Sequence, residues 1–396
     1  MQKADVAIVG AGIIGCACAY YLARAGLSVV VIDRDQINSG ASGRNAGSLH
    51  FQLEYRLIQN QEALHTQLPH LIPLTLAAIE QWKSLDKELG ADIGLGMSGG
   101  MMLAETSQQV SILERKAEVE NKYGLAVTLL DKNQTLAKAP YLSDSINAAL
   151  FCEFEGHCNP RLLTPAFSRA AAELGVDFSV ESLVQRVDRR SGKWHLQVQK
   201  ENTTSTVVVE HVVNAAGAWA HEFGLKANVH LPIFPVPLMM SVTESTPKFL
   251  NYLIQHVGQK LSLKQVADGN VLIGGGWSSR LKGDGIAKTV AREADIELSQ
   301  LKANLRVASN TIPALKKLNL LRTWTGITGV TADQLPLVGG IKAAPGMHVA
   351  AGGSGFTYGP IYAKLLSESI LTGREPELIA PYSPNRFSHI NMFMGA

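Results

Sequence analysis

The sequence predicts an α/β fold in which a dinucleotide-binding domain is built from separate chain segments and carries an inserted α+β domain. Two observations support this. A glycine-rich turn follows an apolar strand close to the N-terminus, and similar strand and helix patterns return after residues 151 and 323. The segments in between do not continue that pattern and are rich in strands. The chain has 396 residues, of which 46% are hydrophobic, enough for one large domain or two ordinary ones.

The N-terminal segment reads as strand, glycine turn, helix, strand and acid. Residues 6–9 are apolar, Gly10-Ala-Gly12-Ile13-Ile14-Gly15 follows, and Asp33 ends the apolar run 29–32. In this Rossmann-like context Gly10 permits the tight turn, Gly12 lets the backbone approach a pyrophosphate, and Gly15 lets the helix pack on the strand. The helix N-terminus favours phosphate, and the Asp33 carboxylate can accept ribose hydroxyls, which disfavours NADP. NAD and FAD both stay open, because both have an ADP half.

The later elements follow from apolar spacing and from the positions of glycine and proline. Asn159 precedes Pro160, which is a helix cap followed by proline at the first helical position. We expect helices over 13–25, 69–89, 106–123, 160–174, 288–315 and 360–371. We expect strands over 99–104, 207–213, 261–265, 271–277 and 348–351.

These elements suggest a discontinuous domain organisation. The Rossmann-like domain is predicted to comprise residues 1–50, 151–222 and 323–396. The substrate domain is predicted to comprise residues 51–150 and 223–322, and we expect it to contain a mostly antiparallel sheet.

Composition and charge exclude several classes of protein. Lys and Arg number 36 and Asp and Glu 34, a net charge of +2 that gives no electrostatic case for nucleic acid or an anionic membrane. No apolar run reaches the roughly 18 residues of a membrane span. The first strand begins within five residues of Met1, so we expect no secretory signal. The four cysteines (16, 18, 152 and 158) lack metal or disulfide spacing, so we expect no metal and a cytoplasmic location.

Several motifs together resemble the D-amino-acid-oxidase-like flavoprotein family, over almost the whole chain. This family includes glycine and sarcosine oxidases and the flavin subunits of opine and hydroxyproline dehydrogenases. Segments 43–50, 261–265 and 273–277 resemble most the flavin (beta) subunit of opine-oxidase-type complexes. The motifs are the glycine turn, Ser39-Gly-Ala-Ser-Gly-Arg-Asn-Ala-Gly47, Asn214-Ala-Ala-Gly-Ala-Trp219, Asp333-Gln-Leu-Pro336 and the glycine-rich turn 352–359.

The resemblance implies FAD rather than NAD, and non-covalent FAD, because no cysteine lies near Gly326. Residues expected at the ADP portion are Gly10, Gly12, Ile13, Ile14, Gly15, Asp33, Arg34, Ala216, Gly217 and Trp219. Residues expected along the pyrophosphate and the flavin are Ser42, Gly43, Arg44, Asn45, Ala46, Gly47, Gly326, Gly353, Ser354, Gly355, Phe356 and Thr357.

The cationic groups that bind the substrate carboxylate in the family are missing here. Thr328 stands where glycine-oxidase-like members have an arginine, and Thr357 where sarcosine-oxidase-like members have a lysine. His50 replaces a further arginine, and Leu272 replaces the lysine credited with oxygen activation. Carboxylate recognition must therefore use other groups, and we single out His50, Lys264 and Arg322.

Each candidate also has an ordinary structural interpretation. His50 either binds a carboxylate when protonated or lies neutral at a domain edge. Lys264 either lines the pocket or lies on a solvated strand face. Tyr358 either caps the pocket or packs in the core. Trp277 and Trp324 are expected mainly in the core.

The resemblance implies oxidation of the C–N bond of an amino acid or secondary amine acid such as an opine, a D-amino acid or a proline derivative. Hydride transfer to flavin N5 gives an imine, which water hydrolyses. Three hypotheses follow: a dehydrogenase subunit that passes electrons to a partner subunit or a membrane acceptor, a peroxide-forming oxidase, and a flavin-holding subunit with an inactive pocket. The first predicts a hetero-oligomer, attachment to the inner membrane only through the partner, and an exposed apolar patch around residues 51–75.

Overall fold

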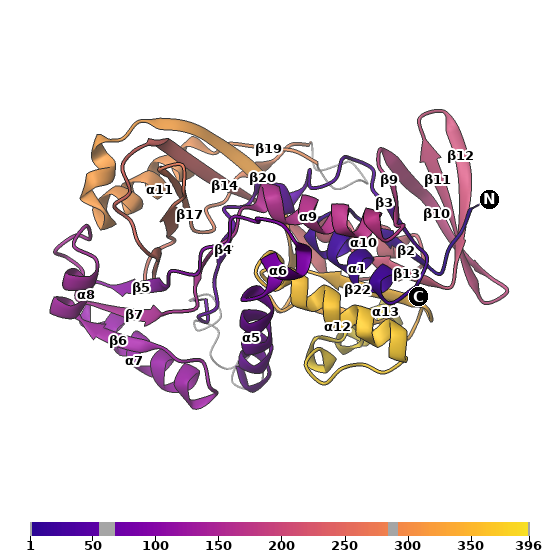
Figure 1. Ribbon diagram of the computed structural model, residues 1–396, viewed down its shortest axis with the longest axis horizontal. Helices are drawn as coiled ribbons and strands as arrows, with labels where there is room; N and C mark the ends of the chain where they lie inside the picture. Colours follow the sequence, from indigo (N-terminus) through magenta and orange to yellow (C-terminus); the bar gives the residue numbers. More distant parts are fainter. Residues whose placement is uncertain (1, 55–67, 284–291, 395–396) are drawn as a thin grey trace.

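The computed structural model describes residues 2–54, 68–283 and 292–394. A six-stranded sheet and an eight-stranded sheet dominate the structure, and Figure 1 shows strand β20 between them. A four-stranded sheet lies at the end of the molecule that is remote from the eight-stranded sheet. No helix of the described ranges is both long enough and apolar enough to cross a membrane.

The six-stranded sheet has the predicted Rossmann-like topology. Its strand pairings are parallel except for that of the edge strand β21, which runs antiparallel. Buried valines and isoleucines on adjacent strands explain why these short segments pair in the interior. In sheet order the strands are β21 (Leu337–Gly340), β22 (Met347–Ala351), β13 (His211–Asn214), β2 (Val6–Val9), β3 (Val29–Ile32) and β9 (Asp177–Ser179).

Two different layers cover the faces of this sheet. On one face α1 (Ile13–Arg24) packs between α9 (Pro160–Glu173) and α12 (Gly359–Thr372). On the other face lies the four-stranded sheet, whose Trp194, Leu196 and Val198 share a core with Val30 and Val212. Its strands are β1 (Gln2–Lys3), β12 (Thr203–Val209), β11 (Lys193–Lys200) and β10 (Ser182–Arg190).

The eight-stranded sheet is mostly antiparallel, as predicted, with one parallel pairing between β15 and β5. One face is closed by α11 (Leu298–Thr311), whose Ala308 joins Leu263 and Ile273 in a core. In sheet order the strands are β20 (Leu320–Thr331), β14 (Ile233–Ser245), β17 (Asn270–Gly274), β16 (Ser262–Gln265), β15 (Leu253–His256), β5 (Gly100–Ala104), β7 (Ala148–Cys152) and β6 (Thr128–Asp131).

The remaining elements connect or flank these sheets. Two small two-stranded sheets pair β4 (Ser48–Leu49) with β8 (Gly156–His157), and β18 (Arg280–Leu281) with β19 (Ala294–Asp295). The other helices are α2 (Ala41–Arg44), α5 (Leu68–Trp82), α6 (Leu85–Leu89), α7 (Ser107–Lys122), α8 (Lys132–Lys138), α10 (Ala220–Leu225) and α13 (Ser388–Met394). Short 3₁₀ helices are η1 (Gly217–Trp219), η2 (Pro313–Lys317), η3 (Ala380–Tyr382) and η4 (Pro384–Phe387).

The structure differs from the expected elements at four places. The helix expected over 69–89 is two helices, α5 and α6, and the one expected over 288–315 begins only at Leu298 within the described residues. The strand expected over 207–213 divides at Glu210, because the Asp5 carbonyl accepts the N–H groups of both Glu210 and His211 and the chain passes from one sheet to the other. The hairpin of β10 and β11 was not expected, because its exposed polar positions hide the strand period.

The predicted domain boundaries at 150 and 322 fall inside strands β7 and β20 of the eight-stranded sheet. Residues 55–67 of the expected apolar patch lie outside the described residues. Its described apolar side chains are buried (Phe51, Leu53, Leu71, Ile72 and Leu74), so this part of the patch is not exposed and that expectation is wrong.

Candidate functional site: an FAD cradle and a buried polar cluster

The glycines of the first turn are needed for close backbone approaches. A Cβ at Gly10, whose φ is +113°, would lie 2.3 Å from the Ala215 carbonyl oxygen at the end of β13. A Cβ at Gly15 would lie 1.9 Å from the Gly10 carbonyl oxygen. At Gly12 the nearest atom is instead the Ser42 hydroxyl, 2.9 Å from the built Cβ. Gly10 and Gly15 therefore shape the turn, while Gly12 faces the loop that follows β3.

The N-terminus of α1 is the predicted phosphate site, and Ser42 lies directly over it. The Ile13 N–H donates to the Ser42 hydroxyl at 3.0 Å. Ile14 packs between the C-terminal glycine turn and α12, since it is the neighbour met by Cβ atoms built at Gly355 and Gly359. The first helical N–H groups and the C-terminal turn thus lie together, where the helix dipole favours an anion.

The expected ADP-binding residues form one group beside this helix end. The Asp33 carboxylate accepts the N–H groups of Ala11 at 2.6 Å and Asp35 at 2.8 Å, and its burial raises its pKa. The Arg34 guanidinium stacks on the Trp219 ring at 4.4 Å, and burial lowers the pKa of Arg34, with a further contribution from Arg292. The Trp219 indole N–H is buried and has no hydrogen-bond partner among the described residues. An orphaned buried donor beside a stacked cation fits a polar ligand such as ADP.

The loop from Ser39 to Gly47 is held by its own side chains. The Asn45 amide donates to the carbonyls of Ala41 and Ser42 at 3.0 and 2.7 Å, and accepts the Gly47 N–H at 2.6 Å. Gly47 has φ +72°, and a Cβ there would lie 2.0 Å from the Cys158 carbonyl oxygen. Ala46 lies half-buried within this loop.

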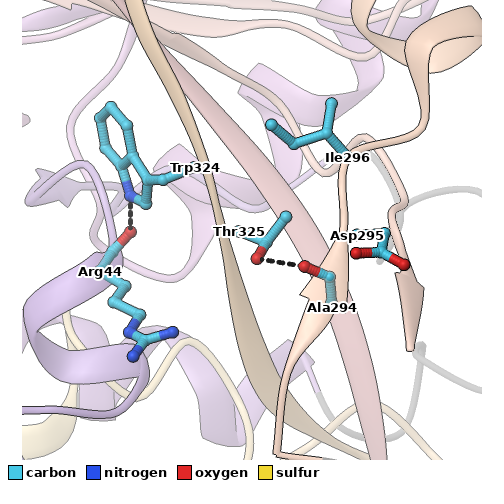
Figure 2. Close-up of a pocket in the computed structure, with 6 residues that line it drawn as sticks. All are labelled: Arg44, Ala294, Asp295, Ile296, Trp324 and Thr325. Atoms are coloured by element: carbon cyan, nitrogen blue, oxygen red, sulfur yellow. Dashed lines mark hydrogen bonds between the residues drawn. The ribbon is translucent and has the colours of Figure 1, made fainter. Parts of the chain in front are cut away.

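Strand β20 contacts the end of this loop and lines a cavity with it. Figure 2 shows the Trp324 indole donating to the Arg44 carbonyl, at 2.7 Å, and Thr325 donating to the Ala294 carbonyl, at 2.9 Å. A Cβ at Gly326 would lie 3.3 Å from the Arg44 Cβ. The cavity measures about 340 Å³ and is lined by Arg44, Ala294, Asp295, Ile296, Trp324 and Thr325. Trp324 is therefore half-buried at a cavity and not in the core where we expected it.

The C-terminal turn closes the cradle. Gly353 has φ +48°, and a Cβ there would lie 2.6 Å from the Pro336 nitrogen. Ser354 is also left-handed, at φ +47°, and its hydroxyl donates to the Glu54 carboxylate. The Phe356 ring packs against Trp82, whose indole N–H donates to the Thr357 carbonyl at 2.7 Å.

Ser262 and Lys264 lie on the face of the eight-stranded sheet opposite α11. They alternate with Leu263, which is buried in the α11 core, so they share the other face. The Ser262 hydroxyl is 3.1 Å from His50 Nε2, and the His50 N–H donates to the Thr357 hydroxyl at 3.4 Å. Three predicted substrate candidates, His50, Lys264 and Thr357, are thus gathered where β4 meets β16.

Lys264 is the most unusual of these residues. Its side chain is 2% exposed, and its ammonium nitrogen has no partner among the described residues. Burial lowers the pKa of Lys264 well below its usual range. The nearby imidazole of His157 also has a pKa lowered to about 4, by burial and then by the charge of Lys264. The solvated-strand interpretation of Lys264 is therefore wrong.

The other candidates lie apart from this cluster. Tyr358 is buried, its hydroxyl is 2.9 Å from that of Thr75, and its ring stacks on Tyr362, which is the packing role. Arg322 is exposed near the start of β20. Thr328 is half-buried on β20, opposite Val236 of β14.

Sequence reasoning missed Ser262 and the buried acid Glu155. Ser262 stands in the sequence only as part of a strand motif, and Glu155 lies in the polar turn between β7 and β8, where acids are normally solvated. No pattern in the chain distinguishes Glu155 from its exposed neighbour Glu153.

Residues 5–369 match the model of the family DAO, FAD dependent oxidoreductase. The chain belongs to this family and is an FAD-dependent oxidoreductase. The predicted family and the predicted cofactor are thereby confirmed.

Several curated relatives match nearly the whole chain. One of the two kinds of subunit of the opine oxidase of Rhizobium meliloti is 25% identical over 395 residues, covering 98% of both chains. Glycine oxidase of Geobacillus kaustophilus is 27% identical, covering 97% of both. Dimethylglycine dehydrogenase of Rattus norvegicus is 26% identical over 98% of this chain, but the chain spans only 45% of that relative's length.

Solved structures confirm the fold. The crystal structure of glycine oxidase from Geobacillus kaustophilus has a TM-score of 0.85 at 26% identity, covering 98% of this chain and 99% of its own. L-proline dehydrogenase from P. horikoshii also has a TM-score of 0.85, at 25% identity, with 98% of each chain covered.

Proposed function

We propose that this FAD-dependent oxidoreductase oxidises the C–N bond of an amino acid or a secondary amine acid. The names of the relatives support this substrate class, since they include an opine oxidase subunit, a glycine oxidase and a dimethylglycine dehydrogenase. The observation that carries the proposal is the buried polar cluster of His50, Ser262 and Lys264 beside the FAD cradle. Such a cluster suits an anionic group next to the reacting carbon.

The FAD site is assigned to the cradle described above. Gly12 and the α1 N-terminus would hold the pyrophosphate, Asp33 the ribose, and Arg34 with Trp219 the adenosine. The four cysteines are buried thiols in other places, which supports non-covalent binding. Their reduced state also fits a cytoplasmic location.

Substrate recognition is assigned to the polar cluster. An unpartnered amine at Lys264 costs free energy that a carboxylate would offset, because the ion pair favours the charged ammonium. Ser262 would donate to the same carboxylate, and His50 would orient the Ser262 hydroxyl. Thr328 and Thr357 are neutral, so the charge on the substrate is met from β16 and not from the positions used in the resembling oxidases.

The chemistry that FAD supplies when bound is acceptance of a hydride from the carbon next to the substrate nitrogen. The chain itself has to place that carbon and exclude water. Hydrolysis of the imine product then needs no side-chain base.

An anaerobic flavin spectrum tests the proposal. The purified holoenzyme is titrated with D-amino acids, N-methyl amino acids, proline derivatives and opines. Bleaching of the visible flavin band by one class is the expected result and names the substrate. A flavin that stays oxidised with every class contradicts the proposal for the isolated chain and supports an inactive pocket or a required partner.

The electron acceptor is a separate part of the proposal. We propose a partner subunit or another acceptor, supported by the likeness to a chain that is named as one subunit of an opine oxidase. A stoichiometric yield of hydrogen peroxide in air would instead identify an oxidase. Co-purification with a second chain would support a hetero-oligomer.

A further inference from the structure

Two buried carboxylates bind three consecutive backbone N–H groups just after His50. Glu155 accepts the N–H groups of Phe51 at 3.0 Å and Gln52 at 3.1 Å. Glu120 accepts the N–H group of Leu53. These amides lie outside any strand or helix, so the carboxylates replace the sheet partners that a buried backbone otherwise needs.

Side chains extend this arrangement into a closed network. The Gln52 amide donates to Glu155 at 2.9 Å and accepts from the Lys116 ammonium at 3.1 Å. Lys116 also forms an ion pair with Glu120 at 2.6 Å, one turn along α7. Gln255 of β15 donates to both Glu155 oxygens, at 3.2 and 3.3 Å. All five side chains are buried.

The sheet leaves a specific space for Glu155. A Cβ at Gly100 of β5 would lie 2.1 Å from one Glu155 oxygen, so only glycine fits there. Gly100 and Gln255 therefore fix Glu155 on the same sheet face that Ser262 and Lys264 occupy. This face reaches the segment 51–53 through one carboxylate.

The segment held in this way joins the two sides of the site. At its start, His50 contacts Ser262 of the eight-stranded sheet. At its end, Glu54 accepts the Ser354 hydroxyl of the C-terminal turn. A displacement of residues 51–53 would move both contacts. Buried ionic networks add little net stability compared with apolar packing, so their value here is in placing the backbone.

We propose that Glu155, assisted by Glu120, is a positioning residue that seats His50 against Ser262 by anchoring the backbone of residues 51–53. The role in substrate binding rests on the proposed function, whereas the anchoring does not.

Amide hydrogen exchange on the FAD-loaded enzyme tests the anchoring. In Glu155→Gln the side-chain amide presents N–H groups to donors, so the amides of Phe51 and Gln52 should exchange at least about tenfold faster, while those of β2 and α1 stay unchanged. The exposed variant Glu153→Gln makes the same charge change two residues away and should match wild type. Exchange of Phe51 and Gln52 within twofold of wild type in Glu155→Gln would overturn the proposal.

A paired exchange of side chains separates positioning from general loss of structure. The double variant Gln52→Glu/Glu155→Gln returns a carboxylate to the network and restores the Lys116 contact, so slow exchange should return. Persistent fast exchange in the double variant, with FAD still bound, contradicts the role of the carboxylate. If Glu155→Gln does not fold, Glu155→Asp keeps the charge but is one methylene shorter, and the same amides should exchange faster.

Steady-state rates give a second readout with whichever amine the wild-type enzyme oxidises. Positioning through His50 predicts a raised KM with kcat within about threefold, and little further effect of Glu155→Gln in a His50→Ala background. Additive effects in that background would contradict a route through His50. If no amine is oxidised, the proposed function fails while the exchange result still decides the anchoring.

Discussion

Lys264 and Leu272 face each other across strands β16 and β17, on the sheet face that meets the polar cluster. Leu272 is the position at which the resembling oxidases have their oxygen-activating lysine. In this chain a lysine stands on the neighbouring strand, directly opposite. The leucine therefore does not separate a dehydrogenase from an oxidase, and the argument for a dehydrogenase must rest on the acceptor test.

The buried amine of Lys264 leads to a stability prediction. The pKa of Lys264 is depressed in the folded protein, so its favourable contribution is complete above about pH 10.5 and is lost as the pH falls. Lys264→Met should therefore raise the thermal midpoint of the holoenzyme at pH 7 and raise it less at pH 10. The exposed Lys260→Met is the matched control, with little expected change. A lower midpoint for Lys264→Met at pH 7 would show that the amine has a stabilising partner.

Two glycines of the first turn should respond differently to substitution. Gly15→Ala places a Cβ 1.9 Å from a backbone oxygen, so we expect loss of several kcal/mol of stability or failure to fold. Gly12→Ala meets only the rotatable Ser42 hydroxyl, so the fold should persist while FAD affinity falls. The ratio of FAD to protein after gel filtration, with a thermal midpoint for each variant, distinguishes the two. Full FAD content in Gly12→Ala would be evidence against the pyrophosphate assignment.

The orphaned indole of Trp219 should contribute to FAD binding. Trp219→Phe keeps a ring under Arg34 but removes the N–H, so FAD affinity should fall about tenfold, the value of one hydrogen bond. Trp277→Phe, on the eight-stranded sheet, is the control and should leave FAD affinity unchanged. Fluorescence titration of the apoprotein with FAD measures both. Equal affinities for wild type and Trp219→Phe would mean that the indole donates to no part of the cofactor.

The pH dependence of Glu155 is predicted by its surroundings. Burial raises the pKa of Glu155 to about 7, although four N–H donors and Lys116 favour its ionised form. Because the folded pKa is raised, the contribution of Glu155 is complete below about pH 4.5 and is lost as the pH rises through 7, by about 3 kcal/mol. Glu155→Gln should lack this loss.

Other groups titrate in the same range, so the test is a difference. His157 and His348 have pKa values lowered to about 4, and their contributions are lost as the pH falls below 6.5. Glu120 and Cys152 also lie near Glu155, each with a pKa raised by burial. Chemical unfolding of wild type and variant from pH 5 to 8 isolates Glu155, and parallel curves would contradict the prediction.

The cofactor half of the site could be predicted from the sequence because its determinants are local. The turn from Gly10 to Gly15 and the cap at Asn159 depend on neighbours a few residues apart, and their elements agree with the prediction. The substrate half depends on residues far apart in the chain. Ser262 meets His50 across 212 positions, and Glu155 meets Phe51 across 104. No local period encodes such contacts, so the buried network around Glu155 and the burial of Lys264 could not be foreseen.

Strand β20 pairs with β14 along its length in the eight-stranded sheet and then reaches the nucleotide-binding side. Within that one strand Trp324 bonds to the flavin-side loop, and Gly329 packs on Gly217 and Ala218 of η1. A rigid-body hinge between the two sheets would have to break these contacts together. The molecule is therefore mechanically continuous at the site, and entry of a substrate must depend on local rearrangement of short segments, with the two sheets moving as one body.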